Sequence, residues 1–98
     1  MKGSDRQYLK SLAHGLKPAV YIGKGGLTDA VVRAAESSLN AHELLKVKFN
    51  GLKDEKQEIA EAIAARTESA LVGIIGNIAT FYRPNPDEEK RQIVLPKS

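Results

Sequence analysis

The chain has 98 residues, of which 42% are hydrophobic and 28% charged, and its formal net charge is +3 at pH 7. This length predicts one domain, large enough to bury a core without disulfides or metal ions. The absence of cysteine excludes disulfides, thiolate metal sites and thiol catalysis. No apolar run reaches the length of a membrane span, and the N-terminus leads into a polar helix and not into a signal peptide. We therefore expect a cytoplasmic protein that does not bind membranes.

The first predicted element is a helix from Ser4 to His14, with Ser4 as its N-cap and Gly15 as its end signal. Its apolar residues at helical spacing are Tyr8, Leu9, Leu12, Ala13 and Leu16. Arg6, Lys10 and His14 recur at intervals of four residues, so they share another face of the helix. We call these three residues the basic ridge. Because a glycine-rich turn follows shortly after this helix, we expect the ridge to lie beside that turn.

A short predicted strand at residues 19–22 leads into the glycine-rich turn and then into a second helix. The turn consists of Gly23, Lys24, Gly25 and Gly26. Its GxxG pattern is the form with which KH-type modules hold a nucleic-acid backbone, and Thr28 is a suitable N-cap for the helix that follows. A helix N-terminus presents unpaired N–H groups and partial positive charge, so the turn with Lys24 at its tip is a candidate phosphate site. A plain strand-to-helix turn without a ligand is the alternative.

The later elements follow from hydrophobic periodicity and from turn residues. They are a helix ending near residue 42, a strand at 45–50, a helix at 55–67, and strands at 70–75 and 78–83. Strict alternation in the strand at 45–50 places Lys46 and Lys48 on the face opposite the core. Asp54 is the expected cap of the third helix, and the continuous apolar run at 70–75 indicates a central strand covered on both faces.

The resulting order is α-β-α-β-α-β-β, which predicts an α/β fold of the two-layer α+β type with a four-stranded mixed sheet. The two helical crossovers favour parallel pairing, whereas Gly76-Asn77 is a hairpin signal that makes the last two strands antiparallel. Two helices would cover one face of the sheet, and the first helix would shield part of the other. We expect a single domain over residues 1–98, with a core at about 4–84 and a C-terminal tail at 85–98 whose apolar segment, residues 93–96, is extended and docked.

The sequence lacks the motifs of several kinds of catalytic site. Residues 23–28 provide neither the GxxxxGK[ST] of a P-loop nor the GxGxxG of a dinucleotide site. His14 and His42 are not paired, and neither has acids at metal-ligand spacing. We therefore expect no catalytic residue, no metal, no cofactor and no small-molecule substrate.

Five segments of the chain resemble one known family. They are YLKSLAH (8–14), LKP (16–18), IGKGGLT (22–28), LLKVK (44–48), and Gly76 together with FYRP (81–84). Over nearly its whole length the chain resembles the CRM domain family (chloroplast RNA splicing and ribosome maturation), in its single-domain, bacterial, YhbY-like form. The resemblance implies a fold similar to the C-terminal domain of translation initiation factor three. It also implies RNA binding and association with precursors of the large ribosomal subunit during assembly.

Basic residues are concentrated in the first part of the chain, where five of them stand against one acid between Met1 and Gly26. The family's GxxG loop carries over onto the turn, and its basic first-helix surface onto Arg6 and Lys10. The turn N–H groups and Lys24 would hold phosphates, while Lys17 would extend the contact and Tyr21 would be available for stacking on a base. The expected RNA-binding residues are Gly23, Lys24, Gly25, Gly26, Arg6, Lys10, Lys17, Tyr21 and Thr28.

The leading hypothesis is thus a monomeric, non-enzymatic RNA-binding assembly factor, with large-subunit ribosomal RNA or pre-ribosomal particles as its partner. Two other classes stay open: a protein-interaction module whose basic face meets an acidic partner, and a phosphate-ester-cleaving enzyme that uses the turn as an anion site. A DNA ligand also stays open, because phosphate contacts alone do not distinguish the two backbones unless a 2′-OH is read.

Overall fold

The computed structural model describes residues 2–95. Met1 and the end of the predicted tail, residues 96–98, lie outside the described residues. The elements in chain order are α1 (Gly3–Ala13), β1 (Val20–Ile22), α2 (Asp29–His42), β2 (Leu44–Phe49), α3 (Lys56–Thr67), β3 (Ala70–Ile75), β4 (Ile78–Tyr82) and a short 3-10 helix, η1 (Glu88–Lys90). The predicted order of helices and strands is therefore confirmed.

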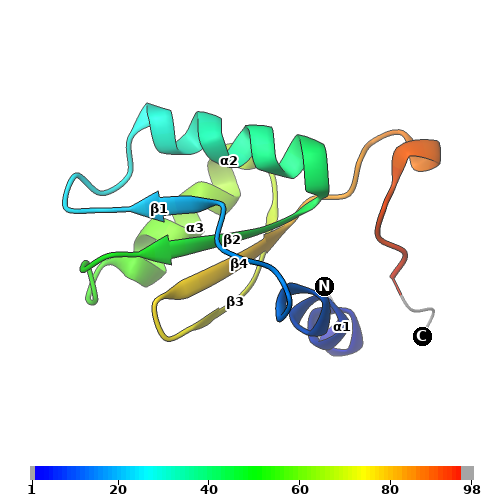
Figure 1. Ribbon diagram of the computed structural model, residues 1–98, viewed down its shortest axis with the longest axis horizontal. Coiled ribbons are helices and arrows are strands. Elements are labelled where there is room, and N and C mark those ends of the chain that lie inside the picture. The colour runs from blue at the N-terminus through cyan, green and yellow to red at the C-terminus, as the bar shows by residue number, and fades with distance from the viewer. Residues whose placement is uncertain (1, 96–98) are drawn as a thin grey trace.

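The four strands form one mixed sheet in the order β1-β2-β4-β3 (Figure 1). The neighbours β1 and β2 are parallel, whereas β4 is antiparallel to both β2 and β3. The turn at Gly76 and Asn77 joins β3 to β4 as the hairpin signal predicts, and Gly76 adopts the left-handed φ of 58° that this turn requires. The predicted mixed sheet is confirmed.

The prediction that residues 70–75 form a central strand is wrong, because β3 is an edge strand. The crossover through α3 skips one strand position, and β4 turns back to fill it, so β2 and β3 run in the same direction without pairing. The strand is apolar on both sides for a different reason. Leu71 and Ile74 pack towards α2 and α3, while Val72 packs towards α1. Coverage of both faces by helices, and not a central position, explains the apolar run.

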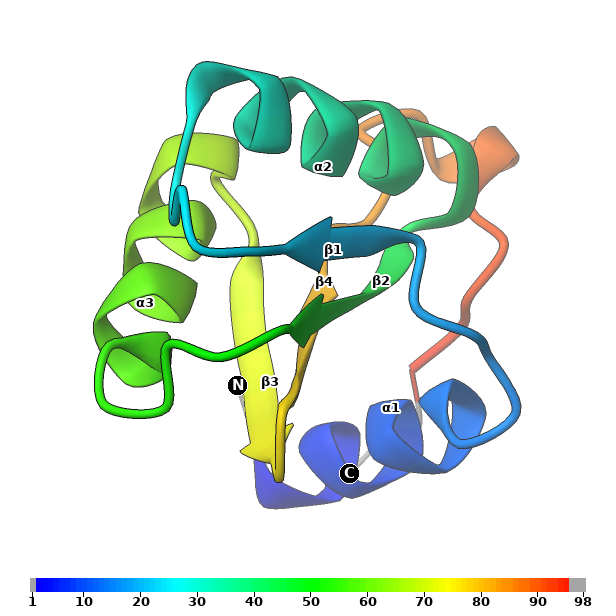
Figure 2. The ribbon, with the colours of Figure 1, turned by 60° about the vertical axis from the view of Figure 1, so that its left-hand side comes forward.

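Two hydrophobic clusters hold the layers together. The larger one lies between the sheet and helices α2 and α3, and its buried residues are Val20, Ile22, Ala35, Leu39, Leu45, Val47, Phe49, Ala60, Ile63, Ala79 and Phe81. The smaller one joins α1 to the other face of the sheet, and its buried residues are Leu9, Ala13, Leu44, Val72 and Tyr82. Figure 2 shows α1 on the side of the sheet opposite α2 and α3. The first helix thus shields part of the second face, as predicted.

Two of the three predicted helix N-caps, Ser4 and Asp54, are wrong. Helix α1 already includes Gly3, so Ser4 lies inside its first turn and Lys2 takes the N-cap position without a side-chain cap bond. Asp54 lies in the turn before α3, whose N-cap position is taken by Glu55, again without a cap bond. Thr28 is confirmed as the N-cap of α2, because its Oγ1 accepts a hydrogen bond from the Val31 N–H at 3.2 Å.

Lys46 attaches the end of α1 to the sheet. Its Nζ donates to the carbonyl oxygen of Ala13, the last residue of α1, at 3.0 Å and to that of Leu16, in the segment that follows, at 2.9 Å. The last carbonyls of a helix have no partner within the helix, and a cation there also interacts favourably with the helix dipole. A lysine of β2 therefore fixes where α1 crosses the sheet.

The tail docks through one buried carboxylate. Glu43 is 1% exposed and adopts a left-handed φ of 65° at the C-cap of α2. Its Oε2 accepts from the Asn85 N–H at 2.6 Å, and its Oε1 accepts from the N–H groups of Gln92 at 2.6 Å and Ile93 at 2.9 Å. Ile93 and Leu95 pack against the smaller cluster. The described part of the tail is thus held to the body of the protein on both sides of the short helix η1.

Candidate nucleic-acid interface

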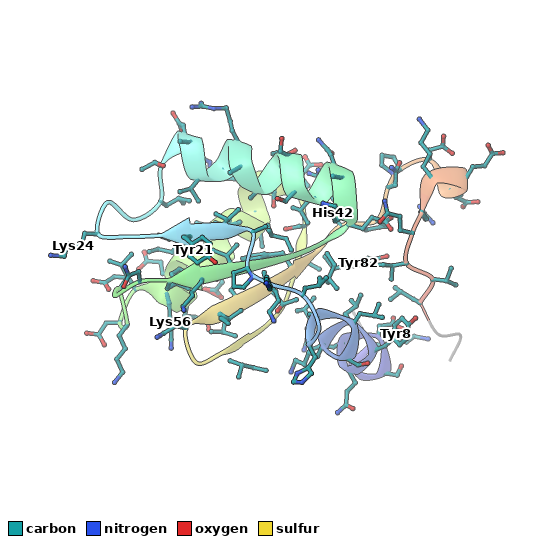
Figure 3. The ribbon with its side chains drawn as sticks, in the orientation of Figure 1. Tyr8, Tyr21, Lys24, His42, Lys56 and Tyr82 are labelled. Carbon is teal, nitrogen blue, oxygen red and sulfur yellow. The ribbon has the colours of Figure 1, made fainter. Side chains whose placement is uncertain are left out.

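The glycine turn, residues 23–26, projects from the end of the sheet where β1 stops (Figure 1). It is closed by a hydrogen bond from the Gly26 N–H to the Gly23 carbonyl oxygen at 3.0 Å. Gly26 has a φ of 66°, in the left-handed region that favours glycine. The tip of the turn is exposed, and the Lys24 side chain points away from the body of the protein (Figure 3).

Gly23 and Gly25 have no structural requirement to be glycine within residues 2–95. Neither has a left-handed φ, and a Cβ added to either would meet nothing within 4 Å. Glycine also costs backbone entropy on folding, so its presence at two such positions is not explained by stability. What a missing side chain does provide is room for another molecule to approach the backbone closely.

The start of α2 is less favourable to anions than its sequence suggests. Asp29 occupies its first turn, and its carboxylate lies 2.9 Å from the Arg66 guanidinium of α3. The hydrogen bond and the charge of Arg66 lower the pKa of Asp29 below its ordinary value. A carboxylate at this point competes with a phosphate for the positive end of the helix. Phosphate binding would therefore depend on the turn and Lys24 more than on the N–H groups of the helix.

A row of side chains crosses the sheet on the face that α1 leaves open. Tyr21 of β1 pairs in register with Lys48 of β2, Lys48 with Ile78 of β4, and Ile78 with Ile75 of β3. Tyr21 and Ile75, at the two edges, are 63% and 71% exposed. We call these four residues the open row. The register places it at the end of the sheet from which the glycine turn projects.

Lys10 of α1 lies at the far side of the same face. Its Cε would be 2.9 Å from a Cβ built on Gly73 of β3, so the lysine chain crosses the strand where no side chain obstructs it. Within residues 2–95, Lys24 and Lys48 have no hydrogen-bonding or ionic partner. These two lysines and the backbone of the turn are therefore available to an external anion.

Comparison with known proteins identifies the family. Residues 1–83 match the family described as the CRS1 / YhbY (CRM) domain. The chain belongs to the CRM domain family. A Haemophilus influenzae protein named "RNA-binding protein" is 45% identical to it, over 95% of this chain and 92% of the relative. The Bacillus subtilis "Probable RNA-binding protein YqeI" is 35% identical, over 98% of this chain and 99% of the relative.

A solved structure supports the fold of this CRM domain. The solution structure of a Staphylococcus aureus protein, described as a candidate RNA-binding protein, superposes with a TM-score of 0.79. The two sequences are 36% identical, and the match covers 98% of this chain and 99% of the other. The predicted family and fold class are thus confirmed.

The CRM domain brings together only some of the residues that the sequence proposed for the site. Gly23 to Gly26, Lys24 and Tyr21 lie at one end of the sheet. Helix α1, with Arg6 and Lys10, packs mainly on β2, β3 and β4. Lys17 precedes β1, whereas the turn follows it. The expectation that the basic ridge lies beside the turn is therefore wrong: the open face of the sheet separates them (Figures 1 and 2).

Thr28, also proposed for the site, has a structural role, because its hydroxyl is already bonded to the first turn of α2. Arg83, from the FYRP segment, also has a structural role. Its guanidinium donates to Glu36 Oε1 at 2.9 Å, to the Thr67 carbonyl at 2.7 Å and to Asn40 Oδ1 at 2.6 Å. It joins α2 to the end of α3 and does not add to the open face.

Lys48 is the functional candidate that sequence reasoning passed over. The alternation of β2 correctly placed it opposite the core, but only the sheet order shows that it is the neighbour of Tyr21.

Among the described residues, no group of three or more His, Cys, Asp or Glu side chains could hold a metal ion. No helix in that range is long and apolar enough to cross a membrane.

Proposed function

We propose that this CRM domain is a cytoplasmic, monomeric RNA-binding protein that associates with precursors of the large ribosomal subunit and assists their assembly. The observation that supports it best is the pair of exposed glycines, Gly23 and Gly25, which nothing in residues 2–95 requires. They flank Lys24, which has no partner in the same range. The curated relatives named as RNA-binding proteins support RNA as the ligand.

In this proposal the protein holds the RNA backbone and catalyses no reaction. The N–H groups of the turn and the Lys24 ammonium contact phosphate oxygens, and the missing side chains let the backbone approach. Lys48 and Lys10 then provide positive charge along the open face, and Arg6 extends it along α1. Phosphate contacts fix position and carry no sequence information directly, so the fit depends on the shape of the RNA.

Sedimentation of cell extracts tests this function. The protein is expected to migrate with large-subunit precursors, and treatment with ribonuclease is expected to release it. Lys24→Glu should reduce the bound fraction, whereas Lys90→Glu, the same charge change on the exposed helix η1, should not. Association that survives ribonuclease would instead support the protein-interaction module. Migration only with free proteins in both conditions would contradict the proposal.

A further inference from the structure

The open face of the sheet ends in a pocket against α1. The pocket measures about 160 Å³, which is below the roughly 300–1,000 Å³ of sites for drug-sized ligands. It is lined by Lys10, Ala13, His14, Lys46, Gly73, Ile75, Ile78 and Thr80. Its volume suits a single small ring system and not a larger ligand. Ile75 and Ile78 give the pocket an apolar wall, and no acid is among the lining side chains.

The pocket and the open row form one continuous surface, since Ile75 and Ile78 belong to both. The row begins at Tyr21, whose ring is largely exposed. Neighbouring strands lie about 4.8 Å apart, so the three spacings from β1 to β3 give a surface about 14 Å wide. Four-stranded sheets of comparable width stack two or three bases in RRM domains.

From this arrangement we propose that an unpaired stretch of RNA lies across the open face, with one base stacked on Tyr21 and another in the pocket beside α1. The inference rests on the proposed function and adds the class of RNA to it. Charge complementarity favours RNA over an apolar peptide, because Lys48 lies within the row and Lys10 lines the pocket. A base-paired RNA would not fit, because its bases are stacked inside the helix and cannot reach Tyr21 or the pocket.

A tryptophan reporter tests the stacking, because the natural chain contains no tryptophan. Tyr21→Trp is titrated with oligouridylate, with oligoadenylate, and with an RNA duplex of the same length. We expect the single strands to quench the tryptophan fluorescence at saturation and the duplex to leave it unchanged. Tyr8→Trp, on a different face of α1 from the basic ridge, is the matched reporter and should not respond.

Affinity measurements complete the test. Tyr21→Ala is expected to weaken single-strand binding by on the order of tenfold, the usual effect of removing one base–aromatic stack. Its salt dependence should not change, because tyrosine neutralises no phosphate. Ile75→Ala, at an exposed position, is expected to weaken the same binding severalfold without unfolding the protein.

The outcomes separate this inference from the proposed function. Binding of RNA with unchanged Tyr21→Trp fluorescence and unchanged Tyr21→Ala affinity would overturn the inference and leave the proposed function intact. Equal or tighter binding of the duplex would overturn it too. An effect of Tyr21→Ala without one of Ile75→Ala would overturn the assignment of the pocket, and failure of all RNAs to bind would contradict both proposals.

Discussion

Replacing Lys24 by glutamate is expected to weaken binding to large-subunit ribosomal RNA and to reduce the slope of log affinity against log salt concentration by about one unit. Each phosphate that a lysine neutralises releases counterions, so the slope reports the number of such contacts. Lys24 is exposed and has no partner within residues 2–95, so its replacement should leave the fold intact. Equilibrium binding across a salt series measures both effects.

Two further variants make this expectation specific to the turn. Lys90→Glu changes the net charge equally at a distant position on η1 and should leave the slope unchanged. Gly25→Ala adds only a methyl group where nothing lies within 4 Å, so stability should be unchanged or slightly higher while RNA affinity falls. Full affinity and an unchanged slope in both Lys24→Glu and Gly25→Ala would contradict the role of the turn.

Replacing Glu43 by glutamine is expected to lower the free energy of unfolding by about 3 kcal/mol, because hydrogen bonds to charged groups contribute about 1.5–3 kcal/mol each. The wild-type carboxylate accepts three backbone N–H bonds from the tail. Glutamine has one acceptor oxygen, and its NH₂ group would face either the Asn85 N–H or the N–H groups of Gln92 and Ile93. Urea unfolding measures the loss, and faster proteolysis within residues 85–95 would show that the tail has been released.

Glu88→Gln is the matched control, because Glu88 is exposed and its nearest cation, Arg91, lies 3.9 Å away. A surface pair of this kind contributes at most about 1 kcal/mol. A loss in Glu43→Gln no larger than in Glu88→Gln would contradict the role of Glu43 in holding the tail.

Acid should release the same tail. Burial alone raises the pKa of Glu43, but the N–H bonds from Asn85, Gln92 and Ile93 outweigh it and hold the pKa below its ordinary value. A group with a lowered pKa in the folded state stabilises that state above its unfolded pKa, about 4.3 for glutamate, and loses the effect as the pH falls towards the folded value. NMR signals of Ile93 and Leu95 should therefore report docking at neutral pH and progressive release as the pH falls below the unfolded pKa of about 4.3, a dependence that Glu43→Gln lacks.

The sequence predicted the elements well because each has a local signal. Alternation marked β2, the turn at Gly76-Asn77 marked the hairpin, and Thr28 marked the start of α2. The position of β3 could not be predicted this way, because an apolar run looks the same in a central strand and in an edge strand covered by two helices. The cap positions predicted for Ser4 and Asp54 were wrong, because Lys2 and Glu55 occupy them.

The candidate site was predictable only in part. The GxxG pattern located the turn, and the short strand before it located Tyr21. The partners of Tyr21 across the sheet depend on strand order and register, which no local pattern contains. Distance along the chain was also misleading for the basic ridge: α1 is close to the turn in sequence, but Lys46 and the smaller cluster hold it under β2, β3 and β4. No local pattern indicated the role of the buried Glu43, because its partners lie up to 50 residues further along the chain.

Mapping of RNA contacts by NMR tests the central claim most directly. Amide signals of the labelled protein are followed while large-subunit ribosomal RNA fragments containing unpaired segments are added. The expected result is that perturbations are largest at residues 23–26, extend through Tyr21 and Lys48 on the open face, and are absent from the exposed side of α3. Perturbations centred on α3 or the tail, with residues 23–26 unaffected at saturation, would contradict the account.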